Sequence, residues 1–383
     1  GLCGLEAALG RRVEEGLQQF AMMDLSLLAW SLGQAESPST PLLSAVRDEA
    51  LVRLHQAGPP ELLQLAAGLS TPPLDLLSEE VFQQLSEAME RSCENLGILS
   101  AAVAADFGED YAAETSMAAG DAAWAEEPTL IFQNEDLLVI NKPRGWMVLT
   151  GAKARAQGDE HGHLSVLRWL ETRSGLAGPF GFVHRIDTHT TGCLLVARTK
   201  TSYLQLRLQF AARKINKSYQ ALVFGAVAPG THREAARLTT TEVDTPGGTA
   251  QETEVDPDGV PAVTEYSPLQ WYTAASGERQ ALTLLSVQTF TGRTHQIRAH
   301  LTFAGYPIVG DSKYGRQSPL CDHPFLHASS IAFGTGARTT GAAGRAVVEA
   351  PLPQDRQEVL GGLVVAAAPA DSDGGVAASP ADA

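Results

Sequence analysis

The sequence predicts an α+β protein in which a helical segment precedes a region of short strands. Leucines recur at helical spacing within residues 20–105, and from Thr129 the chain changes to short apolar runs separated by turn residues, such as LIFQNEDLLVINKP and ALTLLSVQTF. At 383 residues the chain exceeds the usual size of one domain, so we expect two folded units.

The helical segment, residues 1–105, shows weak internal repetition. Similar stretches begin at residues 23, 60 and 94, with the sequences MDLSLLAWSLG, PELLQLAAGLS and ENLGILSAAVA. The first two place leucines on one helix face: Leu25, Leu28 and Leu32, then Leu62, Leu65 and Leu69. The pattern predicts helical-hairpin repeats, loosely similar to those of organellar RNA-binding proteins, although an ordinary helical bundle would give the same leucines.

Two further stretches differ in composition from the helical and β-rich parts. Residues 106–127 are rich in Ala and acidic residues and lack periodicity, which predicts a linker. Residues 361–383 are mostly Ala, Gly, Pro, Ser and Asp, which predicts a disordered tail. The β-rich folded unit is therefore expected over residues 128–360.

Charge is distributed unevenly. The formal net charge is −16, and residues 1–127 hold 5 Lys/Arg against 21 Asp/Glu, whereas the remainder holds 23 of each. Between Asp187 and Glu234 there is no acidic residue, but the basic ones are Arg198, Lys200, Arg207, Arg213, Lys214, Lys217 and Arg233. That stretch either faces phosphates or forms a solvated basic face, and the acidic first third could instead bind a protein partner.

Composition also bears on compartment. No apolar run approaches the roughly 20 residues that span a bilayer, so we expect no membrane segment. Four cysteines are too scattered for a zinc site or a disulfide framework, which indicates a reducing compartment rather than secretion. The chain begins with Gly, so a targeting peptide could be missing, and the cytoplasm, a chloroplast and a mitochondrion all stay open.

The stretch HRIDTHTTG at residues 184–192 joins two apolar runs at an edge of the predicted sheet. Asp187 there has two interpretations: an ion pair with neighbouring Arg185 at a turn, or a charged carboxylate that acts as nucleophile or base. Lys142, after the strand LLVI, either touches phosphate or is solvated. Asp311 in GDSKYG reads as a turn former, and His161 and His163 lack a third ligand for a metal.

Five motifs, in order, resemble the RluA family of RNA pseudouridine synthases. They are INKPRGW (140–146), GFVHRIDTHTTGCLLVART (181–199), NKSYQALVFG (216–225), TGRTHQIRAHLTFAGYPIVGDSKYG (291–315) and FLHASSIAFG (325–334). The resemblance covers about residues 128–352. It implies a mixed, largely antiparallel sheet with a central active-site cleft, and isomerisation of uridine to pseudouridine in rRNA or tRNA without cofactor or metal.

The resemblance also implies roles for single residues. Asp187 matches the catalytic aspartate, Tyr219 the tyrosine that packs on the flipped uracil and moves a proton, and Arg298 the basic partner of the aspartate. Arg185 matches the arginine that enters the RNA helix as the base leaves. The remaining substrate contacts are expected from His184, Arg293, Lys142 and Thr191, although His184, His295 and His300 could instead hydrogen-bond the turns of the site.

We therefore expect an RNA pseudouridine synthase that acts as a monomer and binds the RNA backbone through residues 198–217 and Arg293. The alternative is a non-catalytic RNA-binding or assembly factor that keeps the synthase fold. Which uridine is modified, and whether an attack on the sugar or removal of its C2′ proton starts the reaction, does not follow from the sequence.

Overall fold

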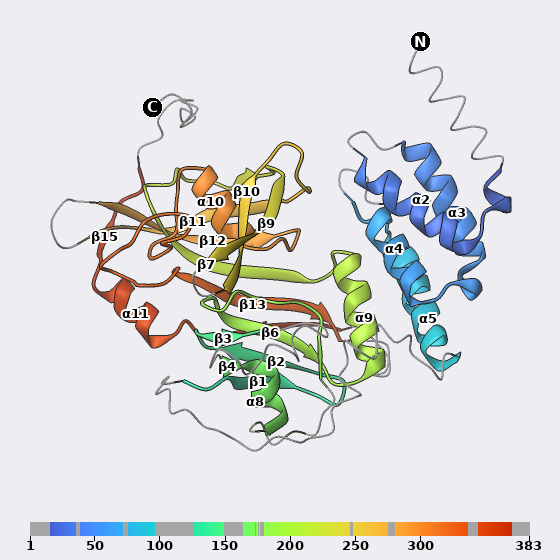
Figure 1. Cartoon of the computed structure of the whole chain (residues 1–383), viewed down its shortest axis with the longest axis horizontal. Coiled ribbons are helices and arrows are strands. Elements are labelled where there is room, and N and C mark those ends of the chain that lie inside the picture. The colour runs from blue at the N-terminus through green and yellow to red at the C-terminus, as the bar shows by residue number, and fades with distance from the viewer. Residues whose placement is uncertain are drawn as a thin grey trace, which may run out of the picture.

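A computed structural model describes residues 16–35, 39–71, 76–95, 126–148, 164–172, 174, 176, 180–245, 248–274, 280–335 and 344–369. Figure 1 shows a group of helices at one end and a large twisted sheet at the other, with α9 between them. The predicted α+β organisation, with helices first and a largely antiparallel sheet after them, is confirmed.

Within residues 16–95, the described part of the helical segment contains four α-helices and two short 3₁₀ turns. They are η1 (Leu17–Gln19), α2 (Met22–Gln34), α3 (Thr40–Val52), η2 (Leu54–Gln56), α4 (Pro59–Leu69) and α5 (Glu79–Asn95). Acidic residues in the first turn start α2 and α4, because Asp24 accepts the Ala21 N–H and Glu61 accepts the Gly58 N–H. Proline at the first positions of α3 and α4 fits there because those N–H groups have no helical partner.

The predicted repeat pairs α2 with α4 through two glycines. Leu25 and Leu62 are fully buried, as their matched spacing predicts. A Cβ on Gly68 would lie 2.3 Å from the Ala29 carbonyl oxygen, and one on Gly33 would lie 2.4 Å from that of Gly68. Only glycine permits this approach, so α2 and α4 cross backbone to backbone. The third predicted copy continues beyond residue 95, outside the described residues.

The main sheet has 11 strands in the part of the chain that the structure describes. Its path runs β1 (Thr129–Gln133), β2 (Leu137–Lys142), β6 (Thr191–Ala197), β13 (Leu326–Gly334), β7 (Asn216–Phe224), β12 (Ala281–Thr289), β11 (Thr264–Thr273) and β15 (Val364–Ala366). Shorter strands join at its sides: β5 (Gly181–Phe182), β8 (His232–Glu234) and β14 (Arg345–Glu349). Among the described strands of this sheet, only β6 and β13 pair in parallel, and they lie near the middle of the path.

Both faces of the sheet are covered where β2 and β6 lie. Cys193 and Leu195 of β6 face the core shared with the helical segment, whereas Leu194 and Val196 face the core under α8 (Val166–Thr172). This alternation explains why the run GCLLVA is apolar throughout. On the other half of the sheet, α10 (Gln296–Phe303) packs in a separate core with β7 and β12.

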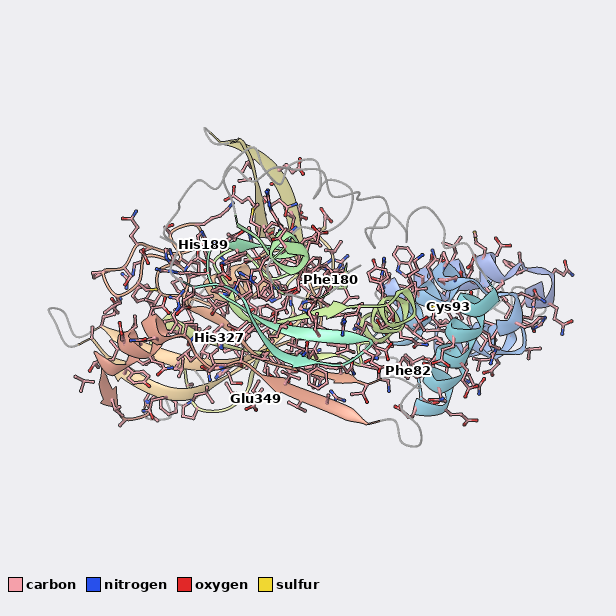
Figure 2. All side chains as sticks on the ribbon, turned by 90° about the horizontal axis from the view of Figure 1, so that it is seen from below. Phe82, Cys93, Phe180, His189, His327 and Glu349 are labelled. Carbon is pink, nitrogen blue, oxygen red and sulfur yellow. The ribbon has the colours of Figure 1, made fainter. Side chains whose placement is uncertain are left out.

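Two small β ribbons stand apart from the main sheet. One pairs β3 (Trp146–Met147) with β4 (Leu164–Ser165), and the other is the hairpin of β9 (Leu238–Thr245) and β10 (Gly248–Val255). The hairpin projects beyond the sheet in Figure 2. It returns to the body where the Thr253 N–H donates to the Tyr314 hydroxyl at 2.9 Å.

The end of the chain differs from the prediction. The tail expected from residue 361 begins with β15, whose three residues pair with Trp271 to Thr273 of β11, after α11 (Gln354–Gly361). Two adjacent valines suit the open edge of β11, and this local β propensity outweighs the polar composition that follows. Residues 370–383 and most of the expected linker lie outside the described residues. None of the described helices is long and apolar enough to span a membrane.

Candidate active site

The turn that carries Asp187 lies between β5 and β6 and is fixed from beneath by a buried lysine. Lys142 is fully buried, and its ammonium group donates to the carbonyl oxygens of Pro143, Trp146 and Thr188 at 2.9 to 3.0 Å. The Thr188 carbonyl also accepts the Gly145 N–H at 2.9 Å. The motif NKPRG therefore holds the aspartate turn in place, and Lys142 reaches neither phosphate nor solvent, contrary to both sequence interpretations.

The Thr-Thr-Gly of the same turn forms the junction between β6 and β13. Gly192 has φ +104°, and a Cβ there would lie 2.2 Å from the Ala328 carbonyl oxygen. Thr191 is buried and hydrogen-bonds His327 Nδ1 at 2.8 Å. The predicted substrate contact of Thr191 is therefore wrong: its hydroxyl joins two strands, and the turn needs glycine so that β13 can approach.

Asp187 meets a second carboxylate through one arginine. Arg298 of α10 grips Asp311 with two hydrogen bonds, Nε to Oδ2 at 2.7 Å and Nη2 to Oδ1 at 2.8 Å. Its remaining nitrogen, Nη1, lies 3.5 Å from Asp187 Oδ2. Asp311 is only 1% exposed and Asp187 is 25% exposed, so the buried carboxylate anchors the guanidinium and the accessible one is left for a ligand.

The predicted pairing of Asp187 with Arg298 is therefore present. The ion pair with Arg185 is not, because the exposed Arg185 side chain has no hydrogen bond or ion pair to the described residues. Asp311 does form the expected turn, since Oδ1 accepts the N–H groups of Lys313 and Tyr314. It also fixes Arg298, a role that sequence reasoning missed although both residues lie in one quoted motif.

His295 and Tyr314 add a second layer around the aspartate. The Tyr314 hydroxyl hydrogen-bonds His295 Nδ1 at 2.8 Å, and the Arg298 guanidinium lies over the Tyr314 ring at 4.7 Å. His295 Nε2 is 4.0 Å from Asp187 Oδ2. His295 is the residue just before α10, and its backbone is left-handed, with φ +50°. Burial lowers the pKa of His295, against the raising effect of Asp187. Sequence reasoning gave no signal for Tyr314.

The loop before α10 is held by a glutamine. Gln296 is buried, and its Oε1 accepts the Thr291 hydroxyl and the Arg293 N–H, while its Nε2 donates to Val263 and Thr264. Every polar position of the amide is used, so TGRTHQ has one defined shape. His300 is likewise buried between Thr264 and the Ala236 carbonyl, as the hydrogen-bonding interpretation predicted.

A small cavity of about 100 Å³ lies over the aspartate, lined by residues of both motifs and by Tyr219 of β7. Tyr219 is 7% exposed. Burial, together with the charge of Asp187, raises the pKa of its hydroxyl, so the phenol keeps its proton at neutral pH. The structure therefore brings Asp187, Tyr219 and Arg298 together, as the resemblance implied.

His184 has a structural position. Its Nε2 accepts the Leu195 N–H at 2.9 Å, and its ring packs on Phe210 at 5.3 Å. Burial, first, and the charge of Lys217 lower its pKa to about 3, so the ring is neutral. This contact ties the aspartate turn to β6, and we find no basis here for its predicted role in substrate binding. His161 and His163 lie outside the described residues.

The basic stretch 198–217 is divided between two tasks. Arg198 donates to the Asn134 carbonyl, and Lys214 pairs with Glu79 of the helical segment at 2.8 Å. Two basic residues of this stretch, Arg213 and Lys217, line a groove together with Arg185 and Arg293. Because the apolar side of α9 (Lys200–Ala211) packs against α4 and α5, the stretch is not one continuous exposed face, and its contact with RNA stays a prediction.

Comparisons with known proteins identify the family of the chain. Residues 136–303 match the family model described as RNA pseudouridylate synthase. The chain is 34% identical over 243 residues to the uncharacterized RNA pseudouridine synthase YlyB of Bacillus subtilis, covering 61% of this chain and 72% of that protein. It is 32% identical to the ribosomal large subunit pseudouridine synthase C of Vibrio parahaemolyticus, covering 54% of this chain and 61% of that protein.

A solved structure, human RNA pseudouridylate synthase domain containing 1, aligns with 65% of this chain and 92% of its own, with a TM-score of 0.46 and 23% identity. The helical segment before residue 96 precedes the matched family region. The sequence matches, by their identity and extent, establish that the chain belongs to the RluA family of RNA pseudouridine synthases.

Proposed function

We propose that this protein isomerises uridine to pseudouridine within RNA, with Asp187 as the catalytic carboxylate. The observation that carries the proposal is the fork of Arg298: two of its nitrogens are held by buried Asp311, and the third faces accessible Asp187. A guanidinium fixed in this way orients the Asp187 carboxylate without blocking it. That arrangement suits a group that must meet the sugar of a bound nucleotide.

The reaction balances without a cofactor. The bond between uracil N1 and ribose C1′ breaks, uracil rotates, a bond forms between C5 and C1′, and the C5 proton is exchanged for one on N1. Asp187 either attacks C1′ and is later released, or removes and returns the C2′ proton, and both routes leave the enzyme unchanged. Tyr219, protonated and buried beside the aspartate, is placed to pack on the extruded uracil and to hold or pass a proton.

We propose rRNA of the large ribosomal subunit as the first substrate class to test. The support is the name of several relatives, ribosomal large subunit pseudouridine synthase C, in the Vibrio species. Transfer RNA is the second class. A monomeric state and a protein partner for the acidic helical segment stay predictions.

The test is pseudouridine mapping by carbodiimide modification of large-subunit rRNA and tRNA incubated with wild-type protein, Asp187→Asn and Asp322→Asn. Asp322 is 79% exposed, so its variant is a matched control that removes a carboxylate elsewhere. We expect the same discrete sites with wild type and Asp322→Asn, and none with Asp187→Asn. Sites that persist with Asp187→Asn would contradict the assignment and favour a protein that only binds RNA.

A further inference from the structure

A groove of about 950 Å³ runs between the helical segment and the synthase sheet. One wall comes from the ends of α2 and α4 and includes Trp30, Gln34 and Thr71. The other wall comes from loops next to the aspartate turn, from the end of α9 and from the strand region around Phe290. The groove adjoins the catalytic cavity, but Asp187 does not line it.

The charge of the groove is opposite to that of the chain. Five basic residues line it: Arg185, Arg213, Lys217, Arg237 and Arg293. Among the described residues that line it, none is Asp or Glu, although the chain has a net charge of −16 and the helical segment is the acidic part. None of the described acidic residues of the helices lines this groove, and its basic lining is complementary to a polyanion.

The groove continues into the catalytic cavity. Arg185, Lys217 and Arg293 line both, as do Thr289, Thr291 and Gly292. A chain lying in the groove would therefore reach Asp187 without leaving the protein surface. RNA that continues from the nucleotide in the active site would therefore occupy the groove.

The wall formed by the helices is firmly attached. Ser70 at the end of α4 donates to the Ala211 carbonyl at 2.9 Å, and Gln205 of α9 exchanges two hydrogen bonds with Ser86 of α5. One continuous hydrophobic core joins the helical segment to α9, β2 and β6. Figure 2 shows α5, marked by Phe82 and Cys93, beside α9. The groove is therefore a fixed feature of the fold.

Trp30 is the aromatic residue that the helical wall presents. Its side chain is 46% exposed although it belongs to α2, and α2 is fixed against α4 by the contact of Gly33 with Gly68. Proteins that hold single-stranded RNA combine a basic groove that follows the backbone with aromatic rings on which bases stack. The groove has both parts, one from each region of the molecule.

Building on the proposed function, we propose that this groove holds the single-stranded RNA next to the target uridine, with Trp30 as a base-stacking residue and Arg213 and Arg237 on the phosphates. The helical segment is then a part of the substrate-binding site. Its acidic character does not oppose this role, because none of its described Asp or Glu residues lines the groove.

The test measures RNA affinity of the full chain with a fluorescein-labelled oligouridylate of about 12 nucleotides, long enough to fill the groove and the cavity. Trp30→Ala should weaken binding about 5- to 100-fold, and Trp30→Phe should restore most of it. Leu27→Ala is the control, because Leu27 lies on the same helix, is 43% exposed and does not line the groove. Arg237→Gln should lower the slope of log affinity against log salt by about 0.7.

A second measurement places the RNA directly. The same oligonucleotide with 4-thiouridine is crosslinked to the full chain and to Asp187→Asn, and we expect crosslinked peptides from α2 as well as from the loop 291–296. Crosslinks confined to residues 180–335, with Trp30→Ala within twofold of wild type, would overturn the proposal. So would polyglutamate that competes with RNA at equal charge concentration, because the groove would then accept an acidic polypeptide.

The outcomes separate this proposal from the proposed function. Crosslinks to α2 in a protein that makes no pseudouridine would support the groove proposal and contradict the proposed function. If Trp30→Ala left pseudouridine formation unchanged at limiting RNA, the groove proposal would be contradicted and the proposed function would stand. Thermal unfolding of Trp30→Ala and Trp30→Phe identifies any loss of affinity that comes from unfolding, since both variants truncate or reshape the same side chain.

Discussion

The helical segment and the synthase sheet differ in charge, composition and local structure, yet they share one hydrophobic core and one groove. The sheet region supplies the chemistry: the fork of Arg298 with Asp187 and Asp311, and buried Tyr219. The helical region supplies a wall with an exposed tryptophan. The net charge of the helical segment therefore does not predict the charge of the groove that it helps to form.

The largest expected effect is on the sheet side. Arg298→Ala leaves Asp311 buried without its partner, so we expect stability to fall by about 3 to 5 kcal/mol and turnover to fall at least about 100-fold. Arg298→Lys keeps the charge but loses the two-pronged geometry, and it should recover only part of the turnover. Chemical denaturation and single-turnover pseudouridine formation measure the two effects.

The control for this prediction is Arg233→Ala, which breaks the exposed pair of Arg233 with Glu265. Surface pairs of this kind contribute about 0 to 1 kcal/mol, so stability and turnover should stay near wild type. Equal effects of Arg298→Ala and Arg233→Ala would show that the buried fork does not organise the site.

The next effect is on the helical side. Gly68→Ala gains about 1 kcal/mol of helix propensity, but the new Cβ meets three backbone atoms of α2 at 2.3 to 2.7 Å, and overpacking typically costs about 1 to 3 kcal/mol. We expect a net loss of stability and weaker RNA binding, with turnover at saturating RNA unchanged. Gly16→Ala is the control, because nothing lies within 4 Å of its Cβ position. A loss of turnover at saturating RNA would instead show that the helical segment contributes to the chemical step and not only to RNA binding.

The third prediction concerns the pH dependence of RNA affinity, which tests whether Lys217 contributes to the basic groove. Burial lowers the pKa of Lys217 to about 8, so its ammonium is charged below that pH and neutral above it. RNA affinity should therefore decline as pH rises from 7 to 9, by about 2- to 5-fold for one phosphate contact. Lys217→Arg should flatten this decline, because arginine stays protonated. A wild-type affinity that does not change over this range would exclude Lys217 from the phosphate contacts.

The smallest effect is expected at the junction of the two regions. Lys214 pairs with Glu79, whose side chain is 80% exposed. Lys214→Gln should change stability by less than about 1 kcal/mol. Ser86→Ala should have a larger effect, because Gln205 Oε1 would lose the hydroxyl that donates to it in a part-buried contact, although its Nε2 keeps the bond to the carbonyl of residue 86. If Lys214→Gln were the more damaging of the two in thermal unfolding, charge rather than packing would hold the regions together.

Much of the fold could be predicted from the sequence, because local patterns carry that information. The order of the motifs also predicts Asp187, Tyr219 and Arg298 as site residues, and these three line one cavity. The fork could not be predicted from spacing, since Arg298 and Asp187 are 111 positions apart and only the fold brings them together.

The errors share one physical cause, which is burial. Lys142 and Thr191 are polar residues beside the aspartate turn, and sequence alone does not show that both point into the protein. The charges of the stretch 198–217 suggest an exposed face, but they do not show that Leu204 and Leu208 of α9 are buried in the core shared with the helices. The groove followed from that docking, and no local pattern indicates which helix covers which face.

The most direct measurement compares turnover and RNA affinity in wild type, Asp187→Asn and Trp30→Ala with the same large-subunit rRNA fragment. We expect Asp187→Asn to lose pseudouridine formation while its Kd stays within about twofold of wild type, and Trp30→Ala to bind more weakly with normal turnover at saturating RNA. Asp187→Asn that still forms pseudouridine would contradict the central claim that this carboxylate performs the chemistry.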